Sequence, residues 1–446
     1  MTDLLVEPAT RPLVGSVPVP SDKSIGHRAL LLAAIATGRS RIRRFSFGED
    51  NVSTMGALRA MGIGIDEVDA ELAVVGGGLF GLQAAAGPLD CGNSGTTMRL
   101  LAGLLAAQPF ATTLVGDASL SRRPMMRVAR PLRARGATIE GAAHPSRDDI
   151  TAPLTVGPLP ERTFLRELEH ASDVASAQVK SALLLSGLYA HGKTFVHEPH
   201  LSRDHTERMM LALGVPLRAV GTVVELDPSG WSGVMPPLDV EIPGDLSAAA
   251  FVLAAGLLVP GSRVTVRDAG SNPTRTGFVE IARDMGGRVA VEPRGDMAGE
   301  PVGHIHVEYT PLRPARIGGE LVPRAVDEIP IACALAARAS GTTVIRDAAE
   351  LRVKESDRIA TMAGVLRAFG VTCDELPDGL EISGRAAPLE PAEIDSRGDH
   401  RIAMTAAILG LLARGPSVVR DAACVATSFP RFAGTLRALG ANVRAV

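Results

Sequence analysis

The sequence is poor in aromatic residues and in cysteine. Only 3% of its 446 residues are aromatic, which leaves few platforms on which single-stranded nucleic acid could stack. The formal net charge of −3 gives no overall attraction to nucleic acid or to anionic membranes. Cys91, Cys333, Cys373 and Cys424 have neither CxxC nor Cys/His ligand spacing. We therefore expect free thiols in a reducing compartment, with no disulfide and no metal site.

Long apolar segments and targeting signals are also missing. The longest uninterrupted apolar run, Ala248 to Pro260, has 13 residues, whereas a membrane-spanning helix needs about 20. Met1 to Glu7 shows neither the basic segment nor the apolar segment of a signal peptide. We expect a cytoplasmic protein without a membrane partner.

What the chain has is apolar material and a repeat. Its length and its 46% hydrophobic content are typical of two or three domains with large cores. A helix pattern that ends in glycine, the residue favoured just past a helix end, occurs six times. These glycines, 70 to 84 residues apart, are Gly62, Gly136, Gly214, Gly286, Gly370 and Gly440. This period exceeds that of ankyrin or tetratricopeptide units and fits α/β subdomains grouped three and three.

Each repeat also contains an earlier, strongly apolar helix that follows a polar turn. These helices are predicted to begin near Ser21, Asn93, Ser176, Asp245, Asp327 and Asp399. A β-rich run such as 112–115 or 342–345 follows, so the unit reads helix, strand, loop, helix, glycine, strand. The Pro-rich stretch 234–238, just before the fourth unit, is the expected hinge.

The first of these helix starts combines caps with cations. Ser21 and Asp22 can cap the helix, and Pro20 marks its boundary. Lys23 and Arg28 fall in the first turns, where the helix dipole disfavours cations. This pattern favours an anionic ligand that reverses the penalty. The alternative is a surface helix start with solvated charges.

Further cations and carboxylates occur at similar places. The glycine-rich opening with Gly92 and Gly95 would let a ligand approach the backbone closely, although it is not a Walker A sequence. Cations at helix starts or in loops after strands are Lys23, Arg28, Arg123, Lys354, Arg358 and Arg401. If these places meet in a cleft between domains, they form a pocket for phosphate and carboxylate groups. Asp327 and Glu355 would then be available for proton transfer. Arg127 and Arg130 are interpreted as a solvated stripe.

Eight motifs, in order, carry a resemblance that covers nearly the whole chain. They are Asp22-Lys23-Ser24 with His27-Arg28, Gly92-Asn93-Ser94-Gly95-Thr96, Arg123-Pro124-Met125, Ser176-Ala177-Gln178, Arg203-Asp204-His205-Thr206-Glu207, Arg352-Val353-Lys354-Glu355-Ser356-Asp357-Arg358, Asp399-His400-Arg401 and Ser428-Phe429-Pro430. With these motifs the chain resembles the 5-enolpyruvylshikimate-3-phosphate synthase family.

The resemblance implies two inside-out α/β domains, each of three βαβαββ repeats, with the active site in the cleft between them. It implies a discontinuous domain of residues 1–20 and 243–446, in which the N-terminal strand joins the last three repeats. Residues 21–242 would form the inserted domain. No metal or organic cofactor is implied, and we expect a monomer.

The implied reaction moves the enolpyruvyl group of phosphoenolpyruvate to the 5-hydroxyl of shikimate 3-phosphate and releases phosphate. By this likeness, the residues that face shikimate 3-phosphate are Ser24, Arg28, Ser176, Gln178, Arg203, Asp327 and Lys354. Those that face phosphoenolpyruvate are Lys23, Gly95, Arg123, Gln178, Arg358 and Arg401, and the same motifs add Asn93, Ala177 and His400 as substrate-binding residues. Asp327 resembles the base that takes the 5-hydroxyl proton, Glu355 would handle the methylene proton, and Lys23 is the third catalytic candidate.

The sequence departs from the family pattern in places. Thr427 stands where some members carry Lys, Gly26 replaces a frequent Ser, and Leu100 follows Arg99 where some members have Pro. Gly95 leaves the phosphoenolpyruvate pocket roomy, which predicts inhibition by glyphosate.

Two other functions compete with this one. The first is UDP-N-acetylglucosamine enolpyruvyl transferase, which shares the fold. Its mobile loop usually carries a reactive Cys where this chain has Ala118. The second is a non-catalytic anion-binding relative, against which the intact Asp327 and Glu355 argue.

Overall fold

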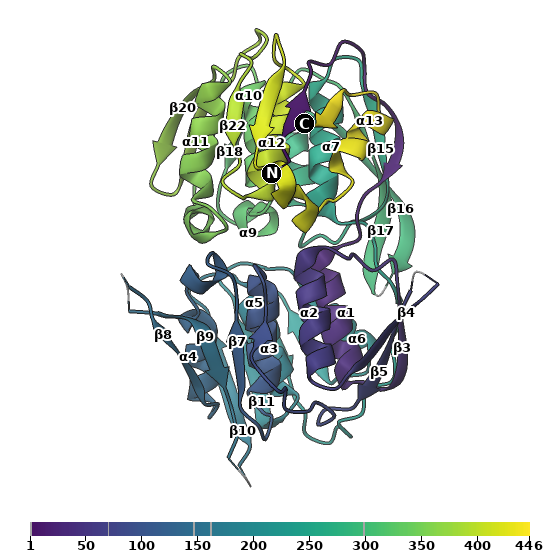
Figure 1. Cartoon of the computed structure of the whole chain (residues 1–446), viewed down its shortest axis with the longest axis vertical. Helices are drawn as coiled ribbons and strands as arrows, with labels where there is room; N and C mark the ends of the chain where they lie inside the picture. Colours follow the sequence, from purple (N-terminus) through teal and green to yellow (C-terminus); the bar gives the residue numbers. More distant parts are fainter. Residues whose placement is uncertain (1, 70, 146–147, 161–162, 298) are drawn as a thin grey trace. The chain divides into compact units, whose positions relative to one another are not determined.

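The computed structural model describes residues 2–69, 71–145, 148–160, 163–297 and 299–446. Its contacts divide the chain into two compact units (Figure 1). Unit 1 comprises the chain up to Pro20, Pro243–Asp296 and Pro301–Val446. Unit 2 comprises Ser21–Ile242 and Met297–Glu300.

Six four-stranded sheets form the β-structure of the described residues, three in each unit. In unit 2 the strand orders are β14 (Asp239–Glu241), β3 (Thr37–Arg43), β5 (Glu71–Gly77), β4 (Gly64–Val68); β6 (Leu89–Asp90), β7 (Thr112–Val115), β9 (Ile150–Val156), β8 (Ile139–Ala143); and β10 (Leu165–Ala171), β11 (Ala190–His197), β13 (Val223–Leu226), β12 (Leu217–Val220). In unit 1 they are β2 (Val14–Pro18), β15 (Arg263–Gly270), β17 (Glu300–Glu308), β16 (Arg288–Met297); β18 (Arg316–Ile317), β19 (Thr342–Ile345), β21 (Gly379–Ser383), β20 (Thr372–Leu376); and β22 (Glu393–Asp395), β23 (Ser417–Arg420), β1 (Leu4–Val6), β24 (Val443–Ala445).

All six sheets share one pattern of strand direction. The first two strands in each order are parallel, and the second and third are antiparallel. The repeat seen in the sequence is therefore a repeat of structure, and the predicted two-domain α/β fold is confirmed.

Two strands are exchanged between the repeats. β2 immediately precedes the first helix of unit 2 in sequence, but it pairs with β15 of unit 1. β14 immediately precedes a helix of unit 1, but it pairs with β3 of unit 2. The N-terminal β1 completes the sheet of the last repeat by pairing with β23 and β24, so both chain ends lie in unit 1 (Figure 1).

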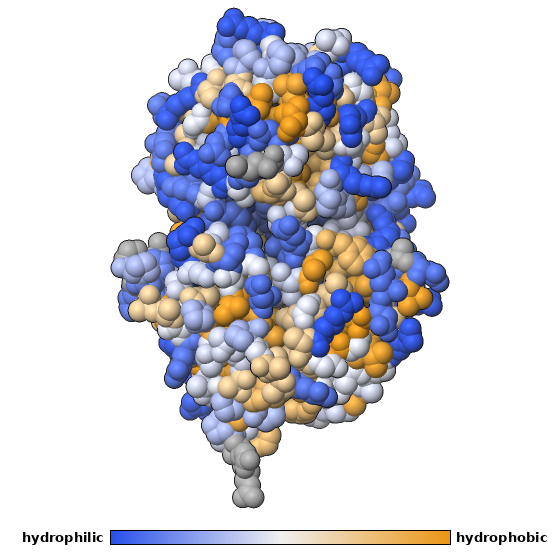
Figure 2. All heavy atoms as spheres, viewed as in Figure 1, coloured by the Kyte–Doolittle hydropathy of each residue, from blue (hydrophilic) through white to orange (hydrophobic). Residues whose placement is uncertain are grey.

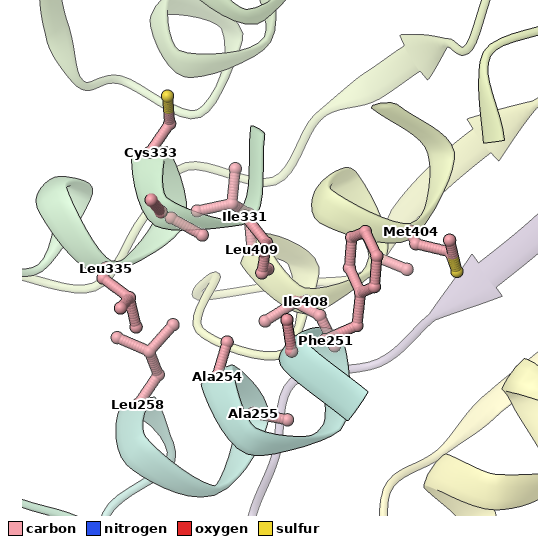
Figure 3. Packing of buried hydrophobic residues seen from close by; sticks show 14 of the residues in the cluster. Phe251, Ala254, Ala255, Leu258, Ile331, Cys333, Leu335, Met404, Ile408 and Leu409 are labelled. Carbon is pink, nitrogen blue, oxygen red and sulfur yellow. The ribbon is translucent and has the colours of Figure 1, made fainter. Parts of the chain in front are cut away.

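The first helix of each repeat is buried on nearly all sides. These helices are α1 (Lys23–Ile35), α3 (Gly95–Leu105) and α5 (Ala177–Gly187) in unit 2, and α7 (Leu246–Leu258), α10 (Ile329–Ala337) and α12 (His400–Gly410) in unit 1. All 13 residues of α7 are buried, as expected of a helix that is apolar all round. Phe251 of α7, Ile331 of α10 and Ile408 of α12 belong to one cluster of buried side chains (Figure 3). Each unit thus has a core of its own.

The second helix of each repeat ends at a marker glycine, as predicted. These helices are α2 (Glu49–Ala60), α4 (Met126–Ala134), α6 (His205–Ala212), α8 (Gly277–Asp284), α11 (Arg358–Ala368) and α13 (Phe432–Ala438). Each marker glycine lies two residues beyond its helix and has a positive φ, between 76° and 106°. Shorter helical segments are α9 (Leu321–Ala325), η1 (Leu120–Arg122), η2 (Ala349–Val353) and η3 (Ala422–Thr427).

The prediction of a hinge at residues 234–238 is wrong. This stretch is bound to β3 within unit 2, because Thr37 N donates to Met235 O at 2.9 Å and Arg41 N donates to Leu238 O at 2.7 Å. A segment tied to a strand in this way cannot act as a free linker, and the chain enters unit 1 further on, at Pro243.

Hydrophobic side chains are unevenly distributed on the surface. Of the 13 exposed large hydrophobic residues that the structure describes, 11 belong to unit 2, and the exceptions are Val14 and Val446. Figure 2 shows one face, on which unit 1 is largely hydrophilic. Among the described residues, no helix combines the length and apolar character needed to cross a membrane.

The buried helix α7 allows a stability test of unit 1. Phe251 is fully buried, so Phe251→Ala should lower the free energy of unfolding by about 3–5 kcal/mol, through lost burial and the cavity that remains. Denaturant titration followed by circular dichroism measures this, and the fluorescence of Trp231, which packs on the core of unit 2, gives a separate probe. Phe80→Ala is the control, since Phe80 is 71% exposed. Equal losses in the two variants would contradict the assignment of Phe251 to the core.

Candidate active site

The start of α1 holds its lysine against a carboxylate. Asp22 caps the helix, with its Oδ1 accepting a hydrogen bond from Ile25 N at 2.9 Å. Lys23 Nζ lies 2.7 Å from Asp50 Oδ2, and both side chains are largely buried. The carboxylate compensates the cation at the positive end of the helix dipole. Lys23 is thus a positioned cation and not a solvated one.

Arg28, one turn further on, is buried within hydrogen bonds. Its Nε donates to Thr206 Oγ1 at 2.7 Å, and its Nη2 donates to Ser181 Oγ at 2.7 Å. Nη1 donates to the backbone oxygen of Ser24 at 2.9 Å. Burial lowers the pKa of Arg28 to about 10, with the nearby Glu207 opposing that shift. The guanidinium therefore remains charged at neutral pH.

Arg123 lies beside the glycine-rich start of α3. Ser94 caps the helix, and Arg123 Nη2 donates to Asn93 Oδ1 at 2.5 Å. A Cβ atom on Gly95 would lie 2.8 Å from Arg99 Nη1 and 3.2 Å from Arg123 Nη1. A side chain at position 95 would therefore displace the Arg99 guanidinium and crowd that of Arg123.

The start of α5 connects to the start of α3 through Gln178. Gln178 Nε2 donates to Thr96 Oγ1 at 2.9 Å, and its Oε1 accepts from Arg99 Nη1 at 2.7 Å. Arg99 Nη2 also donates to the backbone oxygen of Pro124 at 3.1 Å. Ser176 is the N-cap of α5, and Ala177 is its first residue.

A hydrogen-bonded series of one imidazole and three hydroxyl groups joins α1, α2 and α3. His27 Nδ1 and Thr54 Oγ1 are 2.7 Å apart, as are Thr54 Oγ1 and Thr97 Oγ1. Thr97 Oγ1 in turn donates to Ser94 Oγ at 2.8 Å. All four side chains are buried, so these hydrogen bonds fix the three helices relative to one another within unit 2.

In unit 1, Arg358 lies among three carboxylates. Its Nε is 2.8 Å from Asp399 Oδ2, and its Nη2 is 2.6 Å from Glu355 Oε2. Its Nη1 is 3.5 Å from Asp327 Oδ1. Arg358 is fully buried, whereas the side chains of Asp327 and Glu355 are 18% and 23% exposed. These two carboxylates can therefore be reached by a small molecule while the guanidinium holds them in place.

Asp399 anchors this cluster. It caps α12, with its Oδ1 accepting from Arg401 N at 3.0 Å. Burial acts to raise the pKa of Asp399, but the guanidinium of Arg358 outweighs that effect and holds it below its usual value. Arg401 Nη1 donates to the backbone oxygen of Asp327 at 2.9 Å. His400 is the buried first residue of α12.

The predicted residues are divided between the two units. Unit 2 contains Lys23, Ser24, Arg28, Asn93, Gly95, Arg123, Ser176, Ala177, Gln178 and Arg203, and unit 1 contains Asp327, Lys354, Glu355, Arg358, His400 and Arg401. Lys354 pairs with Glu350, at 2.9 Å, rather than with a predicted site residue. Arg127 and Arg130 are exposed, as interpreted from the sequence.

Sequence reasoning missed Asp50, Arg99 and the anchoring role of Asp399. Asp50 and Arg99 belong to no pattern that points to Lys23 or Gln178, which lie 27 and 79 residues away. Asp399 did stand in a motif beside Arg401, so its capping position was a usable signal.

One group of described residues has the spacing of metal ligands. The candidate ligand atoms of Asp204, His205 and Glu300 lie within 4.8 Å of one another. However, His205 Nδ1 is bound to Glu300 Oε1 at 2.7 Å, and Asp204 Oδ2 is bound to Arg208 Nε at 2.9 Å. Hydrogen bonds and ion pairs within the protein account for this group, so we assign no metal to it.

The repeated four-stranded sheets and the buried inner helices define the class of fold. The enolpyruvyl transferase NikO from Streptomyces tendae shares this fold, with a TM-score of 0.76 at 20% identity over 100% of this chain and 99% of that chain.

Closer relatives show the family. The family model of EPSP synthase (3-phosphoshikimate 1-carboxyvinyltransferase) matches residues 8–436, and the chain belongs to this family. It is 47% identical over 440 residues to a 3-phosphoshikimate 1-carboxyvinyltransferase of Geobacter sp. (strain M21), covering 98% of this chain and 99% of the relative. An EPSP synthase structure from Acinetobacter baumannii is 39% identical, with a TM-score of 0.86 and complete coverage of both chains.

The buried His27 predicts a pH dependence of stability. Burial lowers its pKa from 6.5 to about 3. Between these values the unfolded chain binds a proton that the folded chain does not, so the stabilisation is full above pH 6.5 and is lost as the pH falls. At pH 5 the free energy of unfolding is therefore lower by about 2 kcal/mol, since each pH unit below 6.5 costs about 1.4 kcal/mol.

Urea unfolding at pH 5 and at pH 7 measures this dependence. His27→Asn, whose amide can still bond Thr54, should show a smaller difference between the two pH values than the wild type. Equal differences in wild type and variant would show that His27 does not carry the effect.

Proposed function

We propose that the chain transfers the enolpyruvyl group of phosphoenolpyruvate to the 5-hydroxyl of shikimate 3-phosphate and releases phosphate. The observation that carries this proposal is the buried Arg358 with Asp327 and Glu355, two partly exposed carboxylates held by one guanidinium. Such an arrangement offers a base, a proton donor and an anion contact together, as addition followed by elimination requires.

Both substrates are anionic, which suits the cations at the helix starts. We assign the groups that bind shikimate 3-phosphate to Ser24, Arg28, Ser176, Ala177, Gln178, Arg203, Asp327 and Lys354. We assign the groups that bind phosphoenolpyruvate to Lys23, Asn93, Gly95, Arg123, Gln178, Arg358, His400 and Arg401. Guanidinium groups match phosphate and carboxylate geometry. The carboxylate partners, such as Asp50 at Lys23, hold these cations in place before an anion arrives.

The proposed chemistry proceeds in two steps. In the first step, the oxygen of the 5-hydroxyl bonds to C2 of phosphoenolpyruvate, and Asp327 takes the proton of that hydroxyl. At the same time, Glu355 gives a proton to the methylene carbon. In the second step, the bond between C2 and the phosphate oxygen breaks and the proton held by Asp327 leaves with the phosphate, while Glu355 takes a proton back from the methyl group. Lys23 and Arg358 stabilise the charges that develop on the transferred group.

A turnover assay tests this function. Phosphate release from phosphoenolpyruvate should require shikimate 3-phosphate and should not occur with UDP-N-acetylglucosamine. Asp327→Asn should lower kcat by about 10²- to 10⁴-fold, the usual contribution of a general base. Asp374→Asn, at an exposed position of β20, is the matched control. Turnover with UDP-N-acetylglucosamine alone would favour the sister activity, and turnover with neither acceptor would exclude both enzymes.

Gly95 provides a test of the phosphoenolpyruvate assignment. In Gly95→Ala the new methyl group would press on Arg99 and Arg123, so we expect KM for phosphoenolpyruvate to rise by about 10- to 100-fold through misplacement of these cations. Gly56→Ala in α2 is the control, because a Cβ there meets no atom within 4 Å. An unchanged KM in Gly95→Ala would contradict the assignment.

The same pair of variants tests inhibition by glyphosate. The wild type and Gly56→Ala should be inhibited in competition with phosphoenolpyruvate, whereas Gly95→Ala should resist. Wild-type activity that is insensitive to millimolar glyphosate at low phosphoenolpyruvate would contradict the roomy pocket.

A further inference from the structure

A lysine is enclosed by two carboxylates inside the core of unit 2. Lys180 lies on α5, where most neighbouring residues are apolar and buried. Its Nζ is 2.7 Å from Glu198 Oε2 and 2.8 Å from Glu207 Oε1. The three side chains, only 2–3% exposed, form what we call the Lys180 triad. Burying three charges is costly, and apolar residues of similar size would often stabilise a fold as well.

One arm of the triad reaches the start of α5. Glu198 Oε1 accepts a hydrogen bond from the backbone N of Ser176, at 3.1 Å. This N–H belongs to the cap residue and has no partner within the helix. Glu198 therefore fixes the turn that presents Ser176, Ala177 and Gln178.

The other arm reaches Arg28. Glu207 follows Thr206, whose hydroxyl accepts from Arg28 Nε at 2.7 Å and lies 2.6 Å from Ser181 Oγ. Ser181 Oγ accepts in turn from Arg28 Nη2 at 2.7 Å. Glu207 Oε2 is buried and has no hydrogen-bond partner among the described residues. Burial raises the pKa of Glu207, and Lys180 opposes that shift. The Glu207 carboxylate in turn opposes the lowering of the Arg28 pKa by burial, so it acts on both cations.

We propose that Lys180, Glu198 and Glu207 are positioning residues for shikimate 3-phosphate, acting through Ser176 and Arg28. This inference rests on the proposed function, in which Ser176 and Arg28 bind that substrate. The triad itself touches neither substrate. It holds two binding groups from different helices in one fixed geometry, so that less ordering is needed when the substrate binds.

Glu198→Ala is the sharpest test. It removes the bond to Ser176 but leaves Lys180 paired with Glu207, so no unpaired buried charge results. We expect KM for shikimate 3-phosphate to rise by about 10-fold, the scale of one lost hydrogen bond from a charged group. KM for phosphoenolpyruvate should stay within about twofold of the wild-type value. Glu225→Ala is the matched control, because it breaks a Lys–Glu pair of unit 2, at 2.6 Å, that is partly exposed.

A second variant tests the other arm. Glu207→Gln keeps the shape of the side chain and the bond from Glu198 to Ser176 but withdraws the charge beside Arg28. It should also raise KM for shikimate 3-phosphate selectively, and it serves as the test if Glu198→Ala does not fold. A purely structural role would instead lower the melting temperature and the active fraction and leave both KM values unchanged, which would overturn the proposal.

Calorimetric titration of shikimate 3-phosphate separates this proposal from the function on which it rests. Wild-type binding with unchanged affinity in both variants would overturn the positioning role alone. Failure of the wild type to bind shikimate 3-phosphate would overturn the proposed function and the positioning role together. Tight wild-type binding that weakens in Glu198→Ala and Glu207→Gln, but not in Glu225→Ala, would support both.

Discussion

The start of a buried helix is the constraint on which the rest of this structure depends. An inner helix such as α12 is enclosed along its length, so its first N–H groups must find partners at the helix start: a cap, water or a ligand. Asp22, Ser94, Ser176, Asp245 and Asp399 supply such caps. The caps leave the remaining N–H groups and the positive end of the helix dipole at the same place, which suits an anion.

Carboxylates hold the cations near helix starts in place when no ligand is bound. Lys23 has Asp50, Lys180 has two glutamates, and Arg358 has three carboxylates. The carboxylates do more than neutralise the cations, because a cation held by a fixed carboxylate keeps one geometry instead of many. An arriving phosphate or carboxylate therefore meets donors that are already ordered, at the cost of competing with the carboxylates that order them.

Local patterns predicted the fold well, because the features that define it are themselves local. Both kinds of helix signal involve residues that are close together in the sequence. One is a helix followed two residues later by glycine, as at Gly370, and the other is a capped apolar helix, as after Asp399. The exchange of β2 and β14 was not predicted from the residues, since strand pairing partners leave no local trace. The charged residues of the candidate site were predicted from motifs, but their partners were not. Arg99 and Gln178 meet across 79 residues of sequence, and only packing brings them together.

The departures from the family pattern show how such packing absorbs local change. At Gly26, where a serine is frequent in the family, a Cβ would lie only 2.5 Å from Asn51 Nδ2. Asn51 uses that space to donate to the backbone oxygen of Ser46 at 3.1 Å, which fixes the loop leading into α2. The small residue on α1 and the amide on α2 are therefore one feature, since a larger side chain at position 26 would displace Asn51. Asp50, the partner of Lys23, directly precedes Asn51. A larger residue at position 26 would thus shift the start of α2, and with it the Asp50 carboxylate that holds Lys23. It would do so although the side chain at position 26 touches neither residue of that ion pair.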